Sequence, residues 1–196
     1  LAAVTPRTRL LALSQVLWTT GQLLPVAELR ARSGVPVLVD GAQSVGAMPV
    51  DVAGLDFLTI SGQKWLCGPD STGALVVAEP EHLALGAPSY LSQRSHERDG
   101  SFVAREGAAR FDSGWWPRAA VAGLRAALAT RPTWAYRRAL ATADRCRSLL
   151  ERRYEVVTPL ERSTLVSFAP REDPVAVVAR LAAHGVQVRE IPGSGL

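Results

Sequence analysis

Residues 37–73 decide how this chain folds, and they read VLVDGAQSVGAMPVDVAGLDFLTISGQKWLCGPDSTG. Two short apolar runs, at 37–39 and 57–60, each end on polar residues. This pattern is typical of buried strands whose following loops carry side chains into a site. The second of these loops contains Lys64, the only lysine in the chain. All the remaining residues among the 22 Lys and Arg are arginines.

A lysine that stands alone among arginines is either a residual surface residue or a group with a task that guanidinium cannot perform. Arginine stays protonated in proteins, whereas a lysine amine can lose its proton and attack a carbonyl to form a Schiff base. Trp65 and Leu66 follow Lys64 directly. We expect these apolar neighbours to hold the amine in a drier environment, which favours its neutral, nucleophilic form.

The first half of the chain alternates between strand and helix patterns. Apolar runs at 9–16, 37–39, 57–60 and 73–78 predict strands, and a segment that opens on Pro and stops at Gly predicts a helix over 25–34. Strand, helix and strand joined by short links predict an α/β fold built on a parallel sheet with right-handed crossovers.

The second half begins with irregular sequence and becomes helical. The pattern predicts a short helix at 80–85, an extended loop over 89–107, helices at 117–130, 132–153 and 174–185, and strands at 154–158, 164–169 and 186–191. We therefore expect residues 1–130 to be part of a large parallel-sheet domain and residues 131–196 to be part of a small α+β domain. Because both ends look cut, we expect a longer protein.

The composition of the chain indicates which classes of binding partner are not expected. The pI of about 9.7 arises from dispersed arginines rather than a basic block, so nucleic-acid binding is not expected. Cys67 and Cys146 are too few for a disulfide framework or a zinc site, and we expect Cys67 to be a small buried residue and Cys146 to be structural. No apolar run reaches the ~18 residues of a membrane span. The expectation is a cytoplasmic protein with no metal or membrane partner.

Four polar residues around the two predicted strands form a chemical set. Asp40 ends one strand and Lys64 follows the other, at the edge where open parallel sheets bind ligands. Pyridoxal phosphate requires a lysine for its aldehyde and a carboxylate beside its pyridine nitrogen. Ser61 offers a hydroxyl to the phosphate, and Gln43 offers an amide to the ring oxygen. Taken singly each is equally a polar loop residue, and Asp-Gly is a common turn pair.

These motifs resemble the class V aminotransferase family of fold-type I pyridoxal-phosphate enzymes. The family pattern is D-x-A-Q, then S-x-H-K, then a G-P turn, and here the segments are DGAQ at 40–43, SGQK at 61–64 and GP at 68–69. The segments SQV at 14–16 and RFDSG at 110–114 match two further family segments. The family includes cysteine desulfurases, isopenicillin N epimerase-like proteins and related C–S lyases.

The resemblance implies a role for each residue of the central set. Lys64 would form the internal aldimine with pyridoxal phosphate, Asp40 would pair with the pyridine nitrogen, and Gln43 would contact the ring oxygen. The resemblance further implies an amino-acid substrate and a homodimer with its sites at the subunit interface.

Three positions depart from the family pattern. The resemblance implies that Ser61 and Gln63 hold the phosphate and that Gln15 lies against the cofactor ring, but the family has histidine at 15 and 63. The amide of Gln63 still donates a hydrogen bond, although it cannot titrate. Trp115 stands where the family often has a threonine that reaches the partner's phosphate. We expect Trp115 and Trp116 to pack at a subunit interface rather than to line the substrate pocket.

The reaction subtype stays open between aminotransferase, cysteine desulfurase or other C–S lyase, and epimerase. The segment KWLCGP at 64–69 resembles the epimerase-like branch more than the desulfurases. A rival from another class is a catalytically inactive homologue that serves as a dimerising or scaffold subunit, motivated by the two His-to-Gln changes and Trp115. A Schiff-base aldolase or decarboxylase without a cofactor would leave Asp40, Gln43 and Ser61 unexplained.

Overall fold

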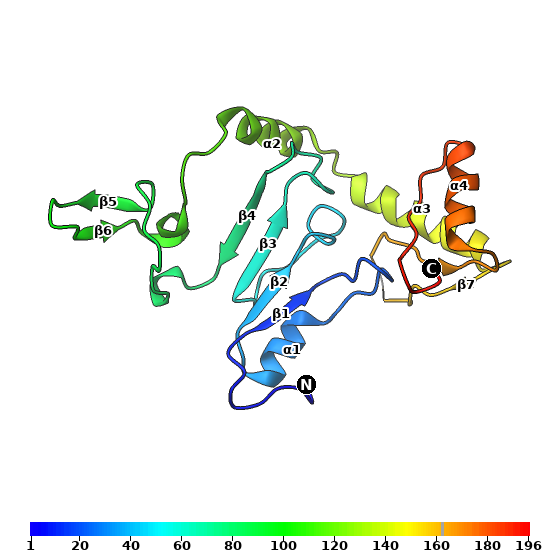
Figure 1. Ribbon diagram of the computed structural model, residues 1–196, viewed down its shortest axis with the longest axis horizontal. Coiled ribbons are helices and arrows are strands. Elements are labelled where there is room, and N and C mark those ends of the chain that lie inside the picture. Colours follow the sequence, from blue (N-terminus) through cyan, green and yellow to red (C-terminus); the bar gives the residue numbers. More distant parts are fainter. Residues whose placement is uncertain (162) are drawn as a thin grey trace.

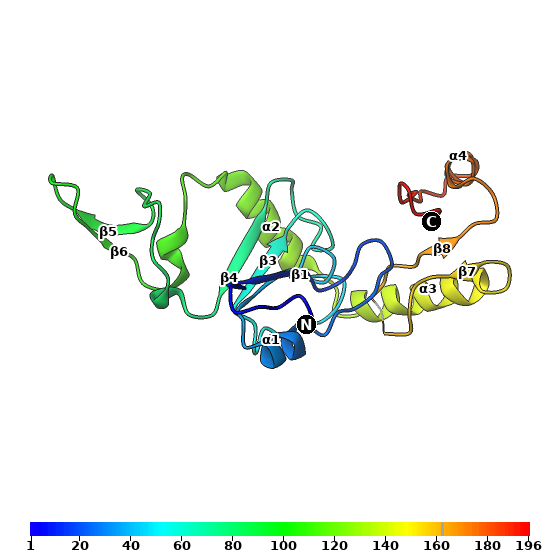
Figure 2. The ribbon, with the colours of Figure 1, turned by 60° about the horizontal axis from the view of Figure 1, so that its bottom comes forward.

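The structure, a computed structural model, describes residues 1–161 and 163–196. A central sheet divides two outlying regions (Figure 1). A two-stranded hairpin extends from one side of the sheet, and two helices with the C-terminus lie on the other side, in both views (Figure 2). The site region therefore lies at the middle of an elongated chain.

Three neighbouring strands of the central sheet run parallel, as the sequence predicts. They are β1 (Leu11–Ser14), β2 (Val37–Asp40) and β3 (Phe57–Ser61), and the sheet order is β1-β2-β3-β4. Helix α1 (Val26–Ser33) connects β1 to β2. Its C-cap Gly34 has φ of 67°, a left-handed conformation that glycine adopts without a steric cost. The strand–helix–strand unit is confirmed.

Strand β4 (Gly73–Val77) runs antiparallel to β3, with Ser61 opposite Gly73, so the sheet is mixed rather than purely parallel. A parallel return needs a crossover of about a dozen residues or more, usually a helix. Residues 62–72 contain turns and no helix, so the chain can return only in the opposite direction. The α/β class is confirmed, with this correction to the direction of one strand.

The hydrophobic core lies on one face of the sheet, beneath α1. Its buried members are Val26, Val37, Val39, Leu55 and Leu58. Burial of such side chains contributes about 1.5–3 kcal/mol each relative to exposure, so this cluster is the principal support of the three parallel strands.

A β-hairpin occupies the segment predicted as a loop at 89–107, and that prediction was wrong. Its strands are β5 (Gln93–His96) and β6 (Phe102–Ala104), and the 3-10 helices at Pro80–His82 and Gly107–Phe111 flank them. Strand β5 (QRSH) is polar and strand β6 (FVA) is a run of three apolar residues, so neither shows an alternation of apolar and polar residues. The Asp99-Gly100 pair, with Gly100 at a φ of 87°, marks the turn and was the available signal.

Helices form the beginning of the second half. The predicted helices at 117–130 and 132–153 are confirmed as α2 (Arg118–Thr130) and α3 (Ala135–Leu150). The predicted domain boundary at residue 130 would fall at the end of α2, and it stays a prediction.

The last part of the chain contains less strand than predicted. Helix α4 (Pro174–Ala183) is confirmed, and Asp173 caps it by accepting from the Ala176 N–H. Strands β7 (Glu155–Val156) and β8 (Phe168–Ala169) are only two residues long. The prediction of a strand at 186–191 was wrong, because in the described part of the chain no strand pairs with this segment.

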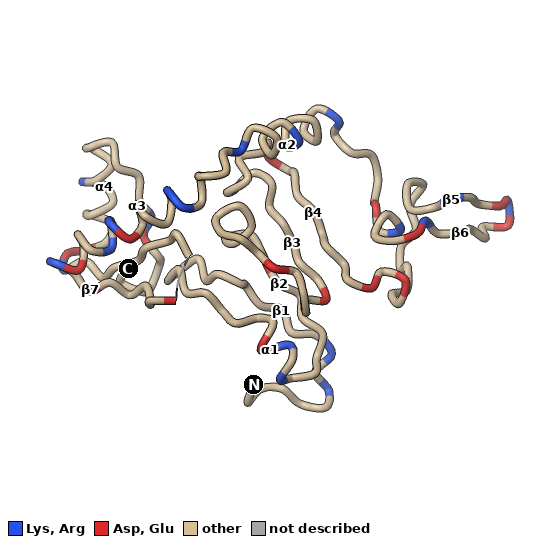
Figure 3. Tube along the Cα trace, turned by 180° about the vertical axis from the view of Figure 1, so that it is seen from behind, with Lys and Arg blue, Asp and Glu red and all other residues tan. Residues whose placement is uncertain are grey.

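Charged residues are dispersed over the molecule. Figure 3 shows basic and acidic positions mixed along α3 and at the tip of the β5–β6 hairpin. Among the described residues there is no group of three or more side chains suited to hold a metal, and no helix has the length and hydropathy to cross a bilayer. The cytoplasmic location expected from the sequence stays a prediction.

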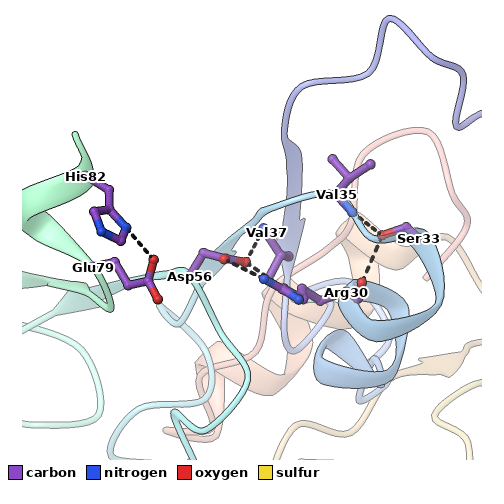
Figure 4. A network of polar contacts seen from close by, with 7 residues as sticks. All are labelled: Arg30, Ser33, Val35, Val37, Asp56, Glu79 and His82. Carbon is purple, nitrogen blue, oxygen red and sulfur yellow. Dashed lines mark hydrogen bonds and ion pairs between the residues drawn. The ribbon is translucent and has the colours of Figure 1, made fainter. Parts of the chain in front are cut away.

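An ion-pair network closes the amino-terminal end of the parallel strands (Figure 4). Asp56 accepts from the Arg30 side chain through Nε and Nη2, both at 3.2 Å, and from the Val37 N–H at 2.9 Å. The hydrogen bond from Arg30 lowers the pKa of Asp56 below its usual value, and the Val37 N–H adds to this effect. This network ties α1 to the start of β2 and β3, at the edge opposite the candidate site.

Candidate functional site

Each of the three parallel strands ends on a polar residue, and these ends lie at the same edge of the sheet. Ser14 ends β1 opposite Asp40 of β2, and Asp40 in turn lies opposite Thr59, two residues before Ser61 ends β3. The Ser14 hydroxyl lies 3.4 Å from Asp40 Oδ2. The structure therefore brings the predicted carboxylate and the start of the lysine loop to one edge of the sheet, where ligands bind in open α/β folds.

The Asp40 carboxylate has one engaged oxygen and one that is almost unengaged. Oδ1 accepts from the Ala42 N–H at 2.9 Å, which fixes the turn after β2. Among the described residues, Oδ2 has only the long contact from Ser14. Because each carboxylate oxygen can accept more than one hydrogen bond, Oδ2 remains able to accept from a ligand N–H.

Backbone hydrogen bonds shape the loop that carries Lys64. The Gly62 N–H donates to the Thr72 carbonyl at 2.8 Å, and the Gly68 N–H donates to the Gly62 carbonyl at 2.8 Å. Within this frame the Cys67 N–H donates to the Lys64 carbonyl at 2.9 Å, closing a tight turn. Lys64 thus lies on a turn held by main-chain bonds, directly beyond the end of β3.

The Lys64 side chain is exposed, so the expectation that Trp65 and Leu66 enclose its amine was wrong. The reason is the direction of the indole. Trp65 turns toward the preceding loop, where its Nε1–H donates to Gln43 Oε1 at 2.9 Å. This side chain therefore joins the two loops instead of covering the lysine.

The loops after β2 and β3 are in close contact. A Cβ built on Gly46 would lie 2.9 Å from the carbonyl carbon of Trp65, so only glycine allows this approach. Arg131 spans the same junction, because its guanidinium donates to the Trp65 carbonyl at 2.6 Å and to the Gly46 carbonyl. Sequence reasoning missed Arg131, which is one of many arginines and lies 66 residues from Trp65 along the chain.

The two glutamines in place of family histidines differ in exposure. Gln15 is buried beside the sheet edge, where its backbone N–H donates to the Asp40 backbone carbonyl at 3.1 Å. Its side-chain Oε1 has no partner among the described residues. Gln63 is exposed next to Lys64. A buried amide oxygen without a partner carries a desolvation cost, which a bound donor would relieve.

Both cysteines are exposed, and for Cys67 this corrects the expectation of burial. Cys67 has a φ of 57°, since it closes the turn that begins at Lys64, and its thiol points outward near the Trp65 carbonyl. Cys146 is exposed on α3, where it lines the groove between this helix and residues 164–166.

A cavity of about 410 Å³ reaches the site from the side of α4. Its lining includes Trp18, Gln43, Leu165, Val177 and Ile191. Gln43 thus lies between the lysine loop and a largely apolar space. Trp115 and Trp116 lie elsewhere and are 78% and 55% exposed, and their predicted place at a subunit interface stays a prediction.

Comparison with known proteins identifies the family. The model of the family described as Aminotransferase class-V matches residues 1–194. The chain therefore belongs to the class V aminotransferase family, which confirms the resemblance. Members of this family are pyridoxal-phosphate-dependent enzymes, so the cofactor implied by the motifs is the cofactor of the family.

Two named activities occur among the relatives. The chain is 42% identical to isopenicillin N epimerase from Streptomyces clavuligerus over 106 residues, which are 51% of this chain and 26% of the relative. It is 47% identical to a probable cysteine desulfurase from Mycolicibacterium paratuberculosis over 79 residues, which are 38% of this chain and 11% of the relative.

Solved structures show the same fold. A cysteine desulfurase from Thermococcus onnurineus superimposes with a TM-score of 0.80 at 25% identity, covering 92% of this chain and 49% of that one. The cysteine desulfurase CsdA from Escherichia coli gives 0.78 at 28% identity, covering 96% and 50%. The chain thus spans about half the length of these structures.

The residues at the sheet edge fit pyridoxal phosphate by their chemistry. The cofactor requires a hydrogen-bond acceptor for its ring N–H, hydrogen-bond donors for its ring oxygen and its phosphate, and an amine that bonds to its aldehyde. Asp40 has a largely unengaged carboxylate oxygen, and Gln43 has an amide nitrogen without an acceptor among the described residues. Ser61 and Lys64 lie on the adjoining strand end and turn.

Proposed function

We propose that this chain is part of a pyridoxal-phosphate-dependent enzyme that acts on an amino acid, with Lys64 as the residue to which the cofactor aldehyde is bonded. The observation that supports this most strongly is the meeting of two loops at the carboxyl edge of the sheet. The hydrogen bond from Trp65 to Gln43 joins the Asp40 loop to the loop of the only lysine.

Each residue of the set has a role that follows from its chemistry. Pyridoxal phosphate supplies an electron sink that stabilises negative charge at the substrate α-carbon. The Asp40 carboxylate holds a proton on the pyridine nitrogen and so preserves that sink. With the cofactor bound, the Lys64 amine would be the group that moves the proton at the substrate α-carbon.

The remaining polar residues position the cofactor. Ser61 and Gln63 are the donors for its phosphate, Gln43 is the donor for its ring oxygen, and Gln15 lies against its ring. Gln15 and Gln63 cannot exchange protons as imidazoles do, so acid–base work at the site falls to Lys64.

The reaction belongs to one of three types: transamination, cleavage of a C–S bond, or epimerisation. The names of the relatives favour the last two, because the matched segments belong to an epimerase and to desulfurases. In all three types Lys64 would be the residue that holds the cofactor aldehyde. We further propose a homodimer with its sites at the subunit interface, as the resemblance implies.

The visible absorption of the full-length protein tests the assignment. Protein purified with pyridoxal phosphate should absorb in the visible range, and Lys64→Ala should abolish that band, whereas Arg171→Ala on an exposed loop should leave it intact. A band that persists in Lys64→Ala would contradict the role of Lys64. A band that no amino acid alters would favour the rival reading as an inactive dimerising homologue.

A further inference from the structure

Trp65 determines the orientation of the Gln43 side-chain amide, that is, on which side its oxygen and its nitrogen lie. An indole N–H can only donate, so the atom that it contacts at 2.9 Å must be the carbonyl oxygen Oε1 of Gln43. The two ends of an amide are otherwise distinguished only by their hydrogen-bond partners. The donor-only partner therefore fixes the amide nitrogen Nε2 on the opposite side.

The N–H groups of the Gln43 side-chain amide are available to donate hydrogen bonds. Among the described residues no acceptor contacts Nε2, and the side chain is half-buried beside the cavity of about 410 Å³. A half-buried amide with its oxygen engaged and its nitrogen unengaged is suited to donate to an anionic oxygen of a ligand.

Trp65 is itself held in place from a distant element. The Arg131 guanidinium, at the junction of α2 and α3, donates to the Trp65 carbonyl and to the Gly46 carbonyl on the Gln43 loop. Gly46 in turn lies against the Trp65 backbone. These contacts fix the Trp65 backbone beside the Gln43 loop, and from that position the indole N–H reaches Gln43 Oε1.

We propose that Trp65 is a positioning residue that turns the Gln43 amide nitrogen toward the ligand, so that it donates to the deprotonated ring oxygen of pyridoxal phosphate. The proposal rests on the proposed function. Without the indole donor the amide is free to present its carbonyl oxygen instead, which would repel an anionic acceptor.

The test uses full-length protein loaded with pyridoxal phosphate and compares three variants. Trp65→Phe keeps an aromatic ring but removes the N–H. Gln43→Glu keeps an acceptor for Trp65 but removes the donor. Trp134→Phe, a tryptophan that lines the same groove along α3 as Trp65, is the matched control. The readouts are the pH titration of the visible band, the cofactor dissociation constant, and thermal melting to verify folding.

Trp65→Phe should raise the apparent pKa of the visible band by about one unit and weaken cofactor binding about tenfold, which corresponds to about 1.4 kcal/mol. Gln43→Glu should shift both quantities in the same direction, and Trp134→Phe should shift neither. In the Gln43→Glu background, Trp65→Phe should add little, since the two residues act through one contact.

Two results would overturn the positioning role: unchanged titration and affinity in Trp65→Phe, or equal effects in Trp65→Phe and Trp134→Phe. Full additivity of Trp65→Phe and Gln43→Glu would also contradict it. If Trp65→Phe does not fold, Gln43→Glu alone decides, because an unchanged titration there excludes an amide donor. A wild-type protein without any visible band would instead refute the proposed function.

Discussion

Asp40 and Asp56 lie at opposite ends of neighbouring strands and differ in how many donors they already serve. Asp56 accepts two hydrogen bonds from Arg30 and one from the Val37 N–H. Its carboxylate therefore holds α1 against the sheet. In the part of the chain that the structure describes, only Ser14 contacts the second oxygen of Asp40, at 3.4 Å. At the residue scale, the engaged carboxylate stabilises the fold and the unengaged one is available to a ligand.

Replacement of Asp56 should destabilise the fold in a pH-dependent manner. Asp56→Ala should lower the free energy of unfolding by about 1–2 kcal/mol at pH 7, after allowance for partial solvent screening. The pKa of Asp56 is lowered in the folded state, so its contribution is present above the unfolded value of 3.8 and is lost as the pH falls through the folded value. Urea unfolding at pH 7 and near pH 3 measures this.

The control for that experiment is Asp70→Ala, which removes an exposed carboxylate on the turn after the lysine loop. It should change stability little at either pH. A difference between wild type and Asp56→Ala that stays constant down to the lowest pH would contradict the assigned ion pair.

The junction between α2 and α3 matters at the element scale, because Arg131 there holds the two loops of the site together. The guanidinium contacts the Trp65 and Gly46 carbonyls, and α2 also packs on the lysine loop, where a Cβ on Gly68 would lie 2.6 Å from the Leu124 side chain. The position of the lysine turn therefore depends on a helix that follows it by some sixty residues.

Removal of the Arg131 guanidinium should loosen both loops. Arg131→Met retains much of the aliphatic stem, and we expect hydrogen exchange of amides in 44–48 and 64–68 to become about tenfold faster, which corresponds to about 1.4 kcal/mol of local opening. Arg125→Met, on the exposed side of α2, is the matched control and should leave these amides unchanged. Equal exchange in both variants would show that Arg131 does not hold the loops.

Sequence patterns predicted elements well where the signal is local. Apolar runs and the Pro25 and Gly34 boundaries placed the parallel strands and α1, and strand ends placed Asp40 and the lysine loop at one edge. The direction of β4 depends on the absence of a crossover helix, and a strand at 186–191 would need a partner strand. Arg131 and the contact of Trp65 with Gln43 join distant residues, which no local pattern records.

The whole molecule is elongated, with large apolar side chains exposed along it. Leu75 of β4 is 47% exposed, and Trp115 and Trp116, which precede α2, are 78% and 55% exposed. The chain spans about half the length of its structural relatives, and exposed apolar surface of this kind is typical of interaction sites.

The two adjacent tryptophans should contribute to the dimer that we propose. In the full-length protein, Trp115→Ser with Trp116→Ser should weaken the dimer at least about tenfold, because aromatic residues dominate interface cores. Sedimentation equilibrium measures the dimer constant. Trp134→Ser, which changes a 50% exposed tryptophan just before α3, is the control. A dimer unaffected by the double change would place the interface elsewhere.

The central claim is that Lys64 carries the cofactor, and the sequence makes one measurement decisive. Borohydride reduction fixes pyridoxal phosphate on its lysine, and trypsin then cannot cut there. Because Lys64 is the only Lys or Arg between Arg32 and Arg94, the reduced protein should yield an uncut peptide of residues 33–94 with the added mass of the cofactor. Peptides 33–64 and 65–94 alone, without added mass, would contradict the account.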